Sequence, residues 1–219
     1  MLTEAPRQTR RKEARPSEIL DAALLLFGEK GYAAASMEDI ARQAGVTKGT
    51  PYRYFRNKED LFKELVKTSI SPTVTALTQY MEDANALPVA VQLKAIVEYW
   101  QTHILATSRS IILKLMVAEA GNFPEVARYY QTEVLGKMTG QLAGLIQLGI
   151  DRKEFRPVDI HMVTHSLIAP MVYAVIQKHC FHCELHGQRA DWLTQAIDLI
   201  ITGLQPSRLT GAPEHSGYC

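Results

Sequence analysis

The chain has 219 residues, of which 47% are apolar and 21% charged, and its formal net charge is +1. This length and apolar fraction predict one or two compact domains and exclude a disordered chain. The 3 cysteines fall late in the sequence without the pattern of a disulfide framework, and the N-terminus lacks an apolar signal segment, so we expect a cytoplasmic protein.

The charge is distributed unevenly along the chain. Residues 1–58 hold 11 Lys and Arg against 7 Asp and Glu, a net charge of +4, whereas residues 59–219 hold 13 against 16, a net charge of −3. This asymmetry predicts an N-terminal part that binds a polyanion and a larger part with a different task.

The first predicted elements are an arm and a helix. Residues 1–12 form a flexible basic arm, which is either a solvated tail or a segment that touches DNA. Apolar residues at helical spacing then predict a helix that Ser17 caps and that ends at Lys30-Gly31.

Three further helix starts follow within a short distance. Ser36 and Asp39 make an approximate capping box for a short second helix, which Gly45 closes. A third helix is expected to begin with Thr47 as its cap, and a fourth opens at Asn57.

The range 40–58 contains no carboxylate and is rich in cations and aromatic residues. Two helices joined at Gly45, the second carrying the cations, are typical of a helix-turn-helix. Gly45 supplies the left-handed backbone of the turn, the small Ala41 permits close approach, and Val46 and Phe55 are expected to bury inward. Basic and aromatic side chains in this setting predict contact with a nucleic-acid backbone.

Several segments of residues 13–73 occur together in one order and spacing, which is more specific than a single motif: Ile19–Ala23, Leu26–Tyr32, Ala44–Val46, Lys48–Thr50 and Asn57–Phe62. With these segments the chain resembles the DNA-binding domain of the TetR family of transcriptional repressors. The resemblance implies an all-helical homodimer that blocks transcription until a ligand binds its larger C-terminal domain.

The resemblance also implies roles for individual side chains. Ser36 would cap the second helix against a phosphate, and residues 47–50 would lie at the tip of the recognition helix in the major groove. Lys48 is expected to reach a base edge, because guanine O6 and N7 are common targets of a cation. The implied DNA-binding residues are Ser36, Thr47, Lys48, Gly49, Thr50, Tyr52, Tyr54 and Lys58, of which Tyr52, Tyr54 and Lys58 would hold phosphates.

Pro51 departs from the family pattern, which usually has an aliphatic or aromatic residue there. If Thr47 caps the recognition helix, the proline ring disfavours helical geometry at Thr50. If instead Thr50 is the cap, Pro51 takes the first helical position, where proline is favourable, and the helix is shorter by about a turn. Both registers remain open at this point.

The remaining pattern is helical throughout. We predict an all-α fold with an N-terminal three-helix helix-turn-helix domain at residues 13–73 and a larger helical domain at residues 74–205, followed by a disordered tail at 206–219. Pro72 is expected to interrupt or kink the fourth helix. The uncharged run 160–177 contains histidines, a serine and a proline, so we expect a buried helix and no membrane partner.

The last two long helices are apolar on more than one face, which indicates burial on two sides. One explanation is a large monomer; the favoured one, also implied by the resemblance, is a homodimer in which two helices from each subunit form a four-helix bundle. The predicted interface residues are Ile160, Val163, Leu167, Met171, Trp192, Ile197 and Ile200.

The resemblance implies a ligand pocket among the middle helices, and we expect its small-molecule effector to be hydrophobic. Aromatic and polar side chains of the kind that pockets use are Tyr80, Trp100, His103, Met116, Glu119, Phe123 and Tyr130. Each of them is also compatible with ordinary core or surface packing.

Soft and borderline metal ligands cluster between residues 179 and 186. The candidates are His179, Cys180, His182, Cys183 and His186. They are compatible with zinc or copper and with a metal- or redox-responsive regulator, but a single CxxC is weak, and the alternative is a helix end whose histidines face the negative dipole. We assign no metal and no cofactor.

The sequence therefore predicts a DNA-binding regulator, most simply a repressor that leaves a palindromic operator when a small effector binds. A metal-dependent enzyme built on the histidine and cysteine cluster is the alternative from another class, and a nonspecific nucleic-acid-binding or adaptor protein is a third. No nucleophile elbow, P-loop, HExxH or dinucleotide fingerprint is present, so we assign no catalytic residue and expect no enzyme activity.

Overall fold

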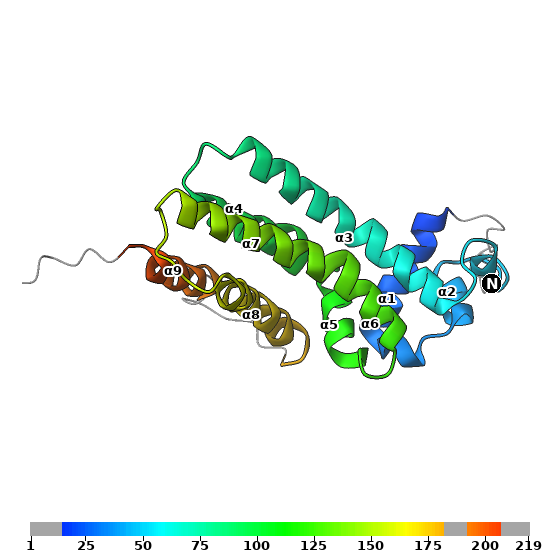
Figure 1. The fold of residues 1–219 in the computed structure, drawn as a ribbon. Helices are drawn as coiled ribbons and strands as arrows, with labels where there is room; N and C mark the ends of the chain where they lie inside the picture. Colours follow the sequence, from blue (N-terminus) through cyan, green and yellow to red (C-terminus); the bar gives the residue numbers. More distant parts are fainter. Residues whose placement is uncertain (1–14, 182–191, 207–219) are drawn as a thin grey trace, which may run out of the picture.

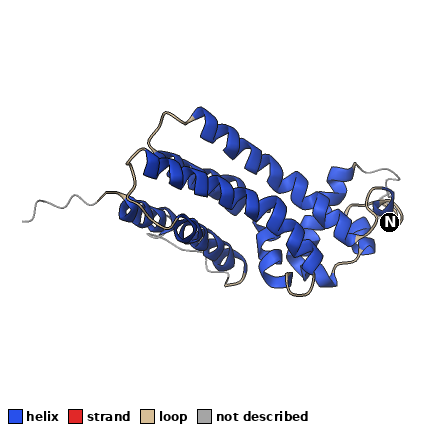
Figure 2. Ribbon diagram, in the orientation of Figure 1, coloured by secondary structure: helices blue, strands red, loops and turns tan. Residues whose placement is uncertain are grey.

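The computed structural model describes residues 15–181 and 192–206, and within these ranges every regular element is a helix (Figure 2). The elements in chain order are α1 (Pro16–Ala34), α2 (Met37–Gln43), the 3₁₀ helix η1 (Pro51–Arg53), α3 (Lys58–Asp83), α4 (Val89–Trp100), the π-helical turn η2 (Gln101–Leu105), α5 (Ser110–Glu119), α6 (Pro124–Tyr130), the π-helical turn η3 (Gln131–Leu135), α7 (Gly136–Asp151), α8 (Ile160–His179) and α9 (Trp192–Leu204). The predicted all-α class is confirmed.

The helices form an elongated body with the N-terminal helices at one end (Figure 1). Helices α1 and α2 pack together beside the start of α3, and the rest of α3 runs along α4 and α7. Helices α8 and α9 pack against each other, α8 against α7 and α9 against α4. Between the two ends, α5 contacts α1 and α6 contacts α3, so the N-terminal helices are packed onto the body.

Two helix boundaries differ from the sequence expectation. Helix α1 begins at Pro16, with Arg15 at the N-cap position, so Ser17 lies inside the first turn and is not the cap. Proline suits this place because the first helical N–H has no intrahelical acceptor. Helix α3 continues through Pro72, which is exposed, so the expected interruption is absent and the predicted boundary after residue 73 falls inside one helix.

An aromatic cluster joins the N-terminal helices to the body. Tyr32 in α1 contacts Phe62 of α3 edge-on at 5.3 Å and Phe123, directly before α6, at 4.6 Å. Phe27 completes the cluster at 5.2 Å from Tyr32. Such pairs add about 0.5–1.5 kcal/mol each beyond the area they bury, so this junction is a packed contact between the two parts.

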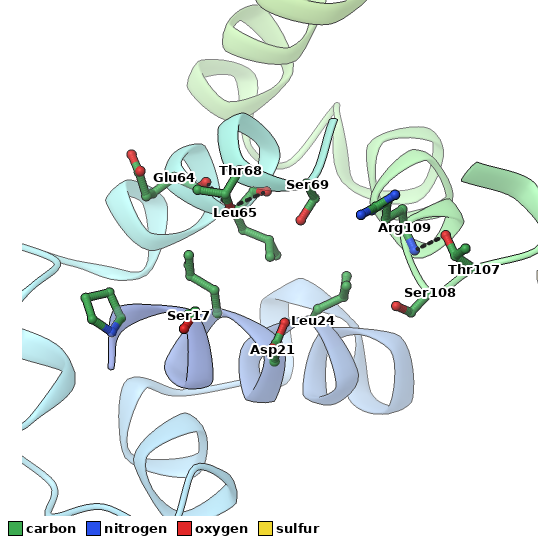
Figure 3. Close-up of a pocket in the computed structure, with 12 residues that line it drawn as sticks. Ser17, Asp21, Leu24, Glu64, Leu65, Thr68, Ser69, Thr107, Ser108 and Arg109 are labelled. Atoms are coloured by element: carbon green, nitrogen blue, oxygen red, sulfur yellow. Dashed lines mark hydrogen bonds between the residues drawn. The ribbon is translucent and has the colours of Figure 1, made fainter. Parts of the chain in front are cut away.

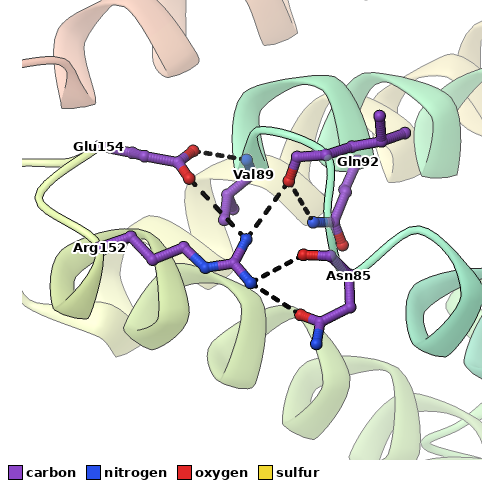
Figure 4. Close-up of polar contacts among 6 residues, drawn as sticks. Asn85, Val89, Gln92, Arg152 and Glu154 are labelled. Atoms are coloured by element: carbon purple, nitrogen blue, oxygen red, sulfur yellow. Dashed lines mark hydrogen bonds and ion pairs between the residues drawn. The ribbon is translucent and has the colours of Figure 1, made fainter.

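The opposite end of the body is tied by polar contacts between two loops (Figure 4). Glu154 accepts a hydrogen bond of 2.6 Å from the backbone N–H of Val89, the first residue of α4. Arg152 donates to the backbone oxygen of Asn85 at 2.7 Å and to its side-chain oxygen at 2.9 Å. A carboxylate at a helix N-terminus satisfies a free N–H and complements the helix dipole, so Glu154 holds the start of α4 in place.

We predict that Glu154→Gln lowers the free energy of unfolding by about 1 kcal/mol, because the charged cap of α4 becomes a weaker, neutral acceptor. The measurement is urea unfolding followed by circular dichroism. The control is Glu125→Gln, since that side chain is 59% exposed in an ion pair with Arg128 and should change stability by less than about 0.5 kcal/mol. Equal losses in the two variants would contradict the capping role.

Candidate nucleic-acid interface and ligand cavity

Helix α2 begins with the predicted capping box. The Asp39 backbone N–H donates to Ser36 Oγ at 3.1 Å, and the Ser36 backbone N–H donates to Asp39 Oδ2 at 3.3 Å. Ser36 is exposed, so the capped N-terminus of α2 faces outward at the edge of the helix-turn-helix. The local sequence signal for this helix start is therefore confirmed.

The turn after α2 also has the predicted construction. Gly45 has a φ of +69°, in the left-handed region that favours glycine. Val46 is buried and its N–H donates to the Ala41 oxygen at 2.9 Å, and Phe55 is buried as well. These contacts fix the segment that follows the turn against α2.

The structure selects the second of the two registers for the recognition segment. Pro51 is the first residue of η1 and Thr50 occupies the N-cap position, so the expected helix start with Thr47 as cap is wrong. Thr47 and Thr50 instead form a tight turn, in which the Thr50 N–H donates to the Thr47 oxygen at 2.9 Å. The regular helix is thus only the three residues Pro51–Arg53 long, and Lys48 lies in the turn before it.

Thr50 differs from the expectation for a DNA contact. It is only 2% exposed, and its hydroxyl is 2.8 Å from the hydroxyl of Thr47. A buried hydroxyl that is already hydrogen-bonded cannot reach a base or phosphate, so Thr50 stabilises the turn from inside.

The other members of the predicted tip face outward. Thr47, Lys48 and Gly49 are exposed, and Lys48 forms an ion pair with Glu38 of α2. The hydrogen bond from Lys48 to the Glu38 carboxylate, followed by the negative charge of Glu38, raises the pKa of Lys48, so the side chain remains a cation at neutral pH. Because both partners lie at the surface, the pair is weak and a phosphate or base edge can replace Glu38.

The two tyrosines expected to hold phosphates are accessible. Tyr52 is 52% exposed and Tyr54 is 40% exposed. Arg53 and Arg56 are exposed beside them. The sequence feature that indicated a DNA-binding role for these two arginines is the carboxylate-free basic range 40–58. The accessible face therefore carries cations that the residue-by-residue resemblance left out.

Lys58 has a different environment from the one expected. Its ammonium donates hydrogen bonds to the backbone oxygens of Tyr32 at 2.7 Å, Ala33 at 3.1 Å and Ala35 at 2.9 Å, and it lies 4.6 Å from the Tyr32 ring centre. An ammonium has three N–H donors, and all three are used. The structure thus assigns Lys58 to closing the C-terminal end of α1 and not to a phosphate.

A narrow apolar cavity lies in the body between α3, α4, α5, α7 and α8. Its volume is about 50 Å³, and a neighbouring one of about 20 Å³ shares Leu77, Trp100, Met138 and Met171 with it. The further lining residues are mainly apolar, with Thr73, Arg109, Tyr130 and Gln141 as the polar ones. Burial raises the pKa of Tyr130, which keeps its hydroxyl neutral.

Both π-helical turns line this cavity. Ile104 belongs to η2, and Val134 and Leu135 belong to η3. In η2 the Ala106 N–H donates to the Gln101 oxygen at 2.8 Å, which is the wider spacing of a π-helix. Single π-helical turns are rare and frequently occur at functional sites, so two on one cavity mark it as the candidate ligand site.

Of the predicted pocket residues, only Trp100 and Tyr130 line the cavity. His103 stacks on Tyr99 at 3.9 Å. Phe123 packs at the junction described above. The remaining ones are Met116, buried in the core, Tyr80, packed against the core, and Glu119, which accepts a hydrogen bond from Asn122.

The α8–α9 surface differs from the predicted interface. Val163, Leu167, Met171 and Ile197 are each less than 5% exposed, because they face the interior of their own subunit. Ile160, Trp192 and Ile200 are partly exposed. The most exposed apolar side chains of these helices are Met162 at 57%, Tyr173 at 47% and Leu199 at 76%.

Helix α8 is also the one described helix long and apolar enough to cross a membrane, by length and composition. It packs against α5, α7 and α9, but only 33% of its apolar window is buried within the subunit, so the predicted burial on two sides is met on one side only. Its exposed apolar positions therefore belong to one outward face of a packed helix.

The predicted metal cluster is only partly described. His179 Nε2 lies 2.9 Å from the buried Ser110 hydroxyl, and Cys180 is exposed. Within residues 15–181 and 192–206 no group of three or more potential metal ligands occurs. His182, Cys183 and His186 lie outside the described residues.

Comparison with known proteins identifies relatives of both parts. Residues 19–65 match the family described as bacterial regulatory proteins, tetR family. The HTH-type transcriptional regulator YhgD of Bacillus subtilis, described as uncharacterized, is 32% identical over 156 residues, which is 68% of this chain and 76% of that protein. The fatty acid metabolism regulator protein of Bacillus subtilis is 25% identical over 199 residues, 88% of this chain and 98% of that protein.

Solved structures share the fold. The fatty acid degradation regulator FadR from Bacillus halodurans aligns with a TM-score of 0.73 and 24% identity over 87% of this chain and 100% of that one. FadR from Bacillus subtilis, crystallised in complex with stearoyl-CoA, aligns with a TM-score of 0.73 and 19% identity over the same shares.

We predict that Lys58→Met destabilises the protein by about 1–3 kcal/mol, because the backbone oxygens of Tyr32, Ala33 and Ala35 lose their donor and two of these contacts, to Tyr32 and Ala35, are part-buried. Thermal unfolding measures the loss. Lys67→Met is the matched control on the same helix, since Lys67 is 63% exposed in a surface pair with Glu64 and should have little effect. A Lys58 variant as stable as the wild type would contradict the role at the end of α1.

Proposed function

The chain belongs to the TetR family of bacterial regulatory proteins, and we propose that it binds operator DNA as a homodimer, represses transcription and releases the DNA when a small effector enters the cavity of the body. The proposal rests on the exposed basic surface of residues 47–56 in the helix-turn-helix. Val46, Thr50 and Phe55 are buried beneath this surface and hold the segment in place. The relatives described above are regulators, and we propose a cytoplasmic regulator without enzyme activity.

On the DNA side, we assign the accessible residues of the tip to the major groove and the flanking ones to the backbone. Thr47, Lys48 and Gly49 supply the groove contacts, and the capped N-terminus at Ser36 suits a phosphate. The phosphate contacts are Tyr52, Arg53, Tyr54 and Arg56, all of which are exposed. Thr50 and Lys58 act from inside, as supports of this surface.

The outward face of α8 and α9 is the proposed dimer interface. Met162, Tyr173 and Leu199 expose apolar area there, and Tyr173 contacts Trp192 edge-on at 5.6 Å, which gives the face an aromatic centre. Two copies of this helix pair can form the four-helix bundle that the sequence predicted. A dimer places two tips on the half-sites of a palindrome, which supplies the affinity that one small domain lacks.

The effector in this proposal has a long apolar part. The cavity lining is dominated by aliphatic side chains and two methionines, and methionine adapts its shape readily. The relative complexed with stearoyl-CoA supports an acyl chain as the occupant. Because about 50 Å³ is far below the volume of such a chain, binding requires the surrounding helices to move.

Induction then follows from differential binding. An effector that fits only the expanded body stabilises that conformation, and the N-terminal helices move with it because they are packed onto α5 and α6. The distance between the two DNA-binding tips then no longer matches the spacing of the operator half-sites. The coupling free energy between the two sites sets the factor by which DNA affinity falls.

We predict that Arg53→Met weakens binding to all DNA and reduces the slope of log K against log salt concentration by about 0.9, the loss of one phosphate contact. Fluorescence anisotropy on the DNA flanking the protein's own gene, over a range of salt concentrations, measures both. Lys137→Met, on the exposed side of α7, is the control. An unchanged slope for Arg53→Met would argue against a phosphate contact.

Lys48→Met is predicted to lose discrimination, by about 1–3 kcal/mol at one base pair of the operator. Affinities for a set of single-base operator variants provide the test. Uniform weakening on every variant would show that Lys48 positions the protein without reading a base.

Leu199→Asp is predicted to give a folded monomer, because a charge is then buried only at the interface. Leu167→Asp, on the inner side of the same helix pair and 2% exposed, should unfold the subunit itself. Sedimentation and circular dichroism distinguish these results, and a Leu199→Asp protein that remains dimeric would move the interface elsewhere.

A further inference from the structure

One arginine lies between the apolar cavity and a cleft of mixed polar and apolar lining that opens between the N-terminal helices and the body. Arg109, just before α5, lines both spaces. The cleft has a volume of about 520 Å³ and lies between α1, α3 and residues 107–109, as Figure 3 shows. Ser69 of α3 lines the cleft and the next residue, Ile70, lines the cavity, so the two spaces meet at this level of α3 as well.

The guanidinium of Arg109 has unused capacity. Nη1 of the guanidinium donates one hydrogen bond, to the His103 backbone oxygen at 3.2 Å. The hydrogen bond to Thr107 Oγ1 at 3.3 Å comes from the backbone N–H of Arg109 and uses no guanidinium donor. Among the ion pairs of the described residues, none involves Arg109. A half-buried guanidinium with five N–H donors and no carboxylate partner favours an anionic ligand group.

The cleft beyond Arg109 does not favour further negative charge. Asp21 of α1 and Glu64 of α3 both line it, together with hydroxyl side chains and an apolar part. The hydroxyls are those of Ser17, Thr68, Ser69, Thr107 and Ser108. An anion is therefore best accommodated at Arg109 itself, with only uncharged or hydrogen-bonding groups beyond it.

We propose that the effector is an apolar chain ending in a single acid group, with the chain in the cavity and the acid on Arg109 at the boundary with the cleft. This inference rests on the proposed function and specifies its ligand. An acid at Arg109 lies at the start of α5, beside the cleft that α1 and α3 also line, so the ligand reaches the contact region between the body and the N-terminal helices.

The test compares two chains that differ only in the end group. Palmitate and 1-hexadecanol are titrated into the full-length protein at neutral pH, and DNA release is followed in parallel. The wild type is expected to bind palmitate about 10–100-fold more tightly than the alcohol, the size of a charged hydrogen-bonded pair. In Arg109→Gln this preference should fall below about 3-fold, and Arg109→Lys should retain part of it.

Arg128→Gln is the matched control, because Arg128 is exposed on α6 and lines neither space. This variant should keep the wild-type preference for palmitate over 1-hexadecanol. Thermal unfolding of each variant shows that it is folded before binding is compared.

The outcomes separate the two proposals. If both compounds bind the wild type equally, or if Arg109→Gln keeps the preference, the acid site at Arg109 is wrong while an apolar effector stands. If neither compound binds, both this inference and the acyl-chain effector are overturned. Binding of palmitate that leaves DNA affinity unchanged would support the site and contradict its role in induction.

Discussion

Helix α3 belongs to both parts of the molecule, and the rest of the structure depends on its continuity. Its first residue, Lys58, closes the end of α1, and Phe62 packs into the aromatic cluster of the N-terminal helices. Further along, the same helix lines the cavity with Ile70, Val74 and Leu77. The helix is continuous from Lys58 to Asp83, with Pro72 inside it, so one element connects the cavity with the DNA-binding end.

A second connection runs beside α3. Gly28 allows α1 to approach α5 closely, since a Cβ at that position would lie 2.9 Å from Ile111 Cδ1, and Tyr32 contacts Phe123 before α6. Burial, followed by the charges of Glu59 and Glu119, raises the pKa of Tyr32 to about 12, so the ring stays neutral at physiological pH. The junction is therefore held by packing. A ligand that rearranges α5 and α6 would change the surface against which α1 packs.

The sequence predicted the features that depend on neighbouring residues and missed those that depend on the tertiary fold. The capping box at Ser36 and the turn at Gly45 are local, and both are confirmed. The burial of Thr50 and the internal bonds of Lys58 arise from segments brought together only by folding, so a match to a family motif assigned both residues to DNA. Of the two registers that the sequence left open, the one with Pro51 at the first helical position is observed. The preference of proline for that position is local, so the sequence could indicate it.

The body was harder to predict for a related reason. A helix that is apolar on two sides does not reveal which side faces its own core, so buried Leu167 was taken for an interface residue, whereas exposed Leu199 was not chosen. Aromatic residues serve both cores and pockets, which explains why Trp100 and Tyr130 line the cavity and Phe123 does not. The π-helical turns have no sequence signature that could have indicated the cavity.

Filling the cavity, in this proposal, moves the DNA-binding tips of a dimer relative to one another. Pulsed electron paramagnetic resonance between spin labels at Gln43→Cys in the two subunits, with Cys180, Cys183 and Cys219 changed to Ser, measures their separation directly. Addition of palmitate is predicted to shift the distance distribution and to release DNA over the same concentration range. Release of DNA with an unchanged distance distribution would show that the effector does not act through the spacing of the tips.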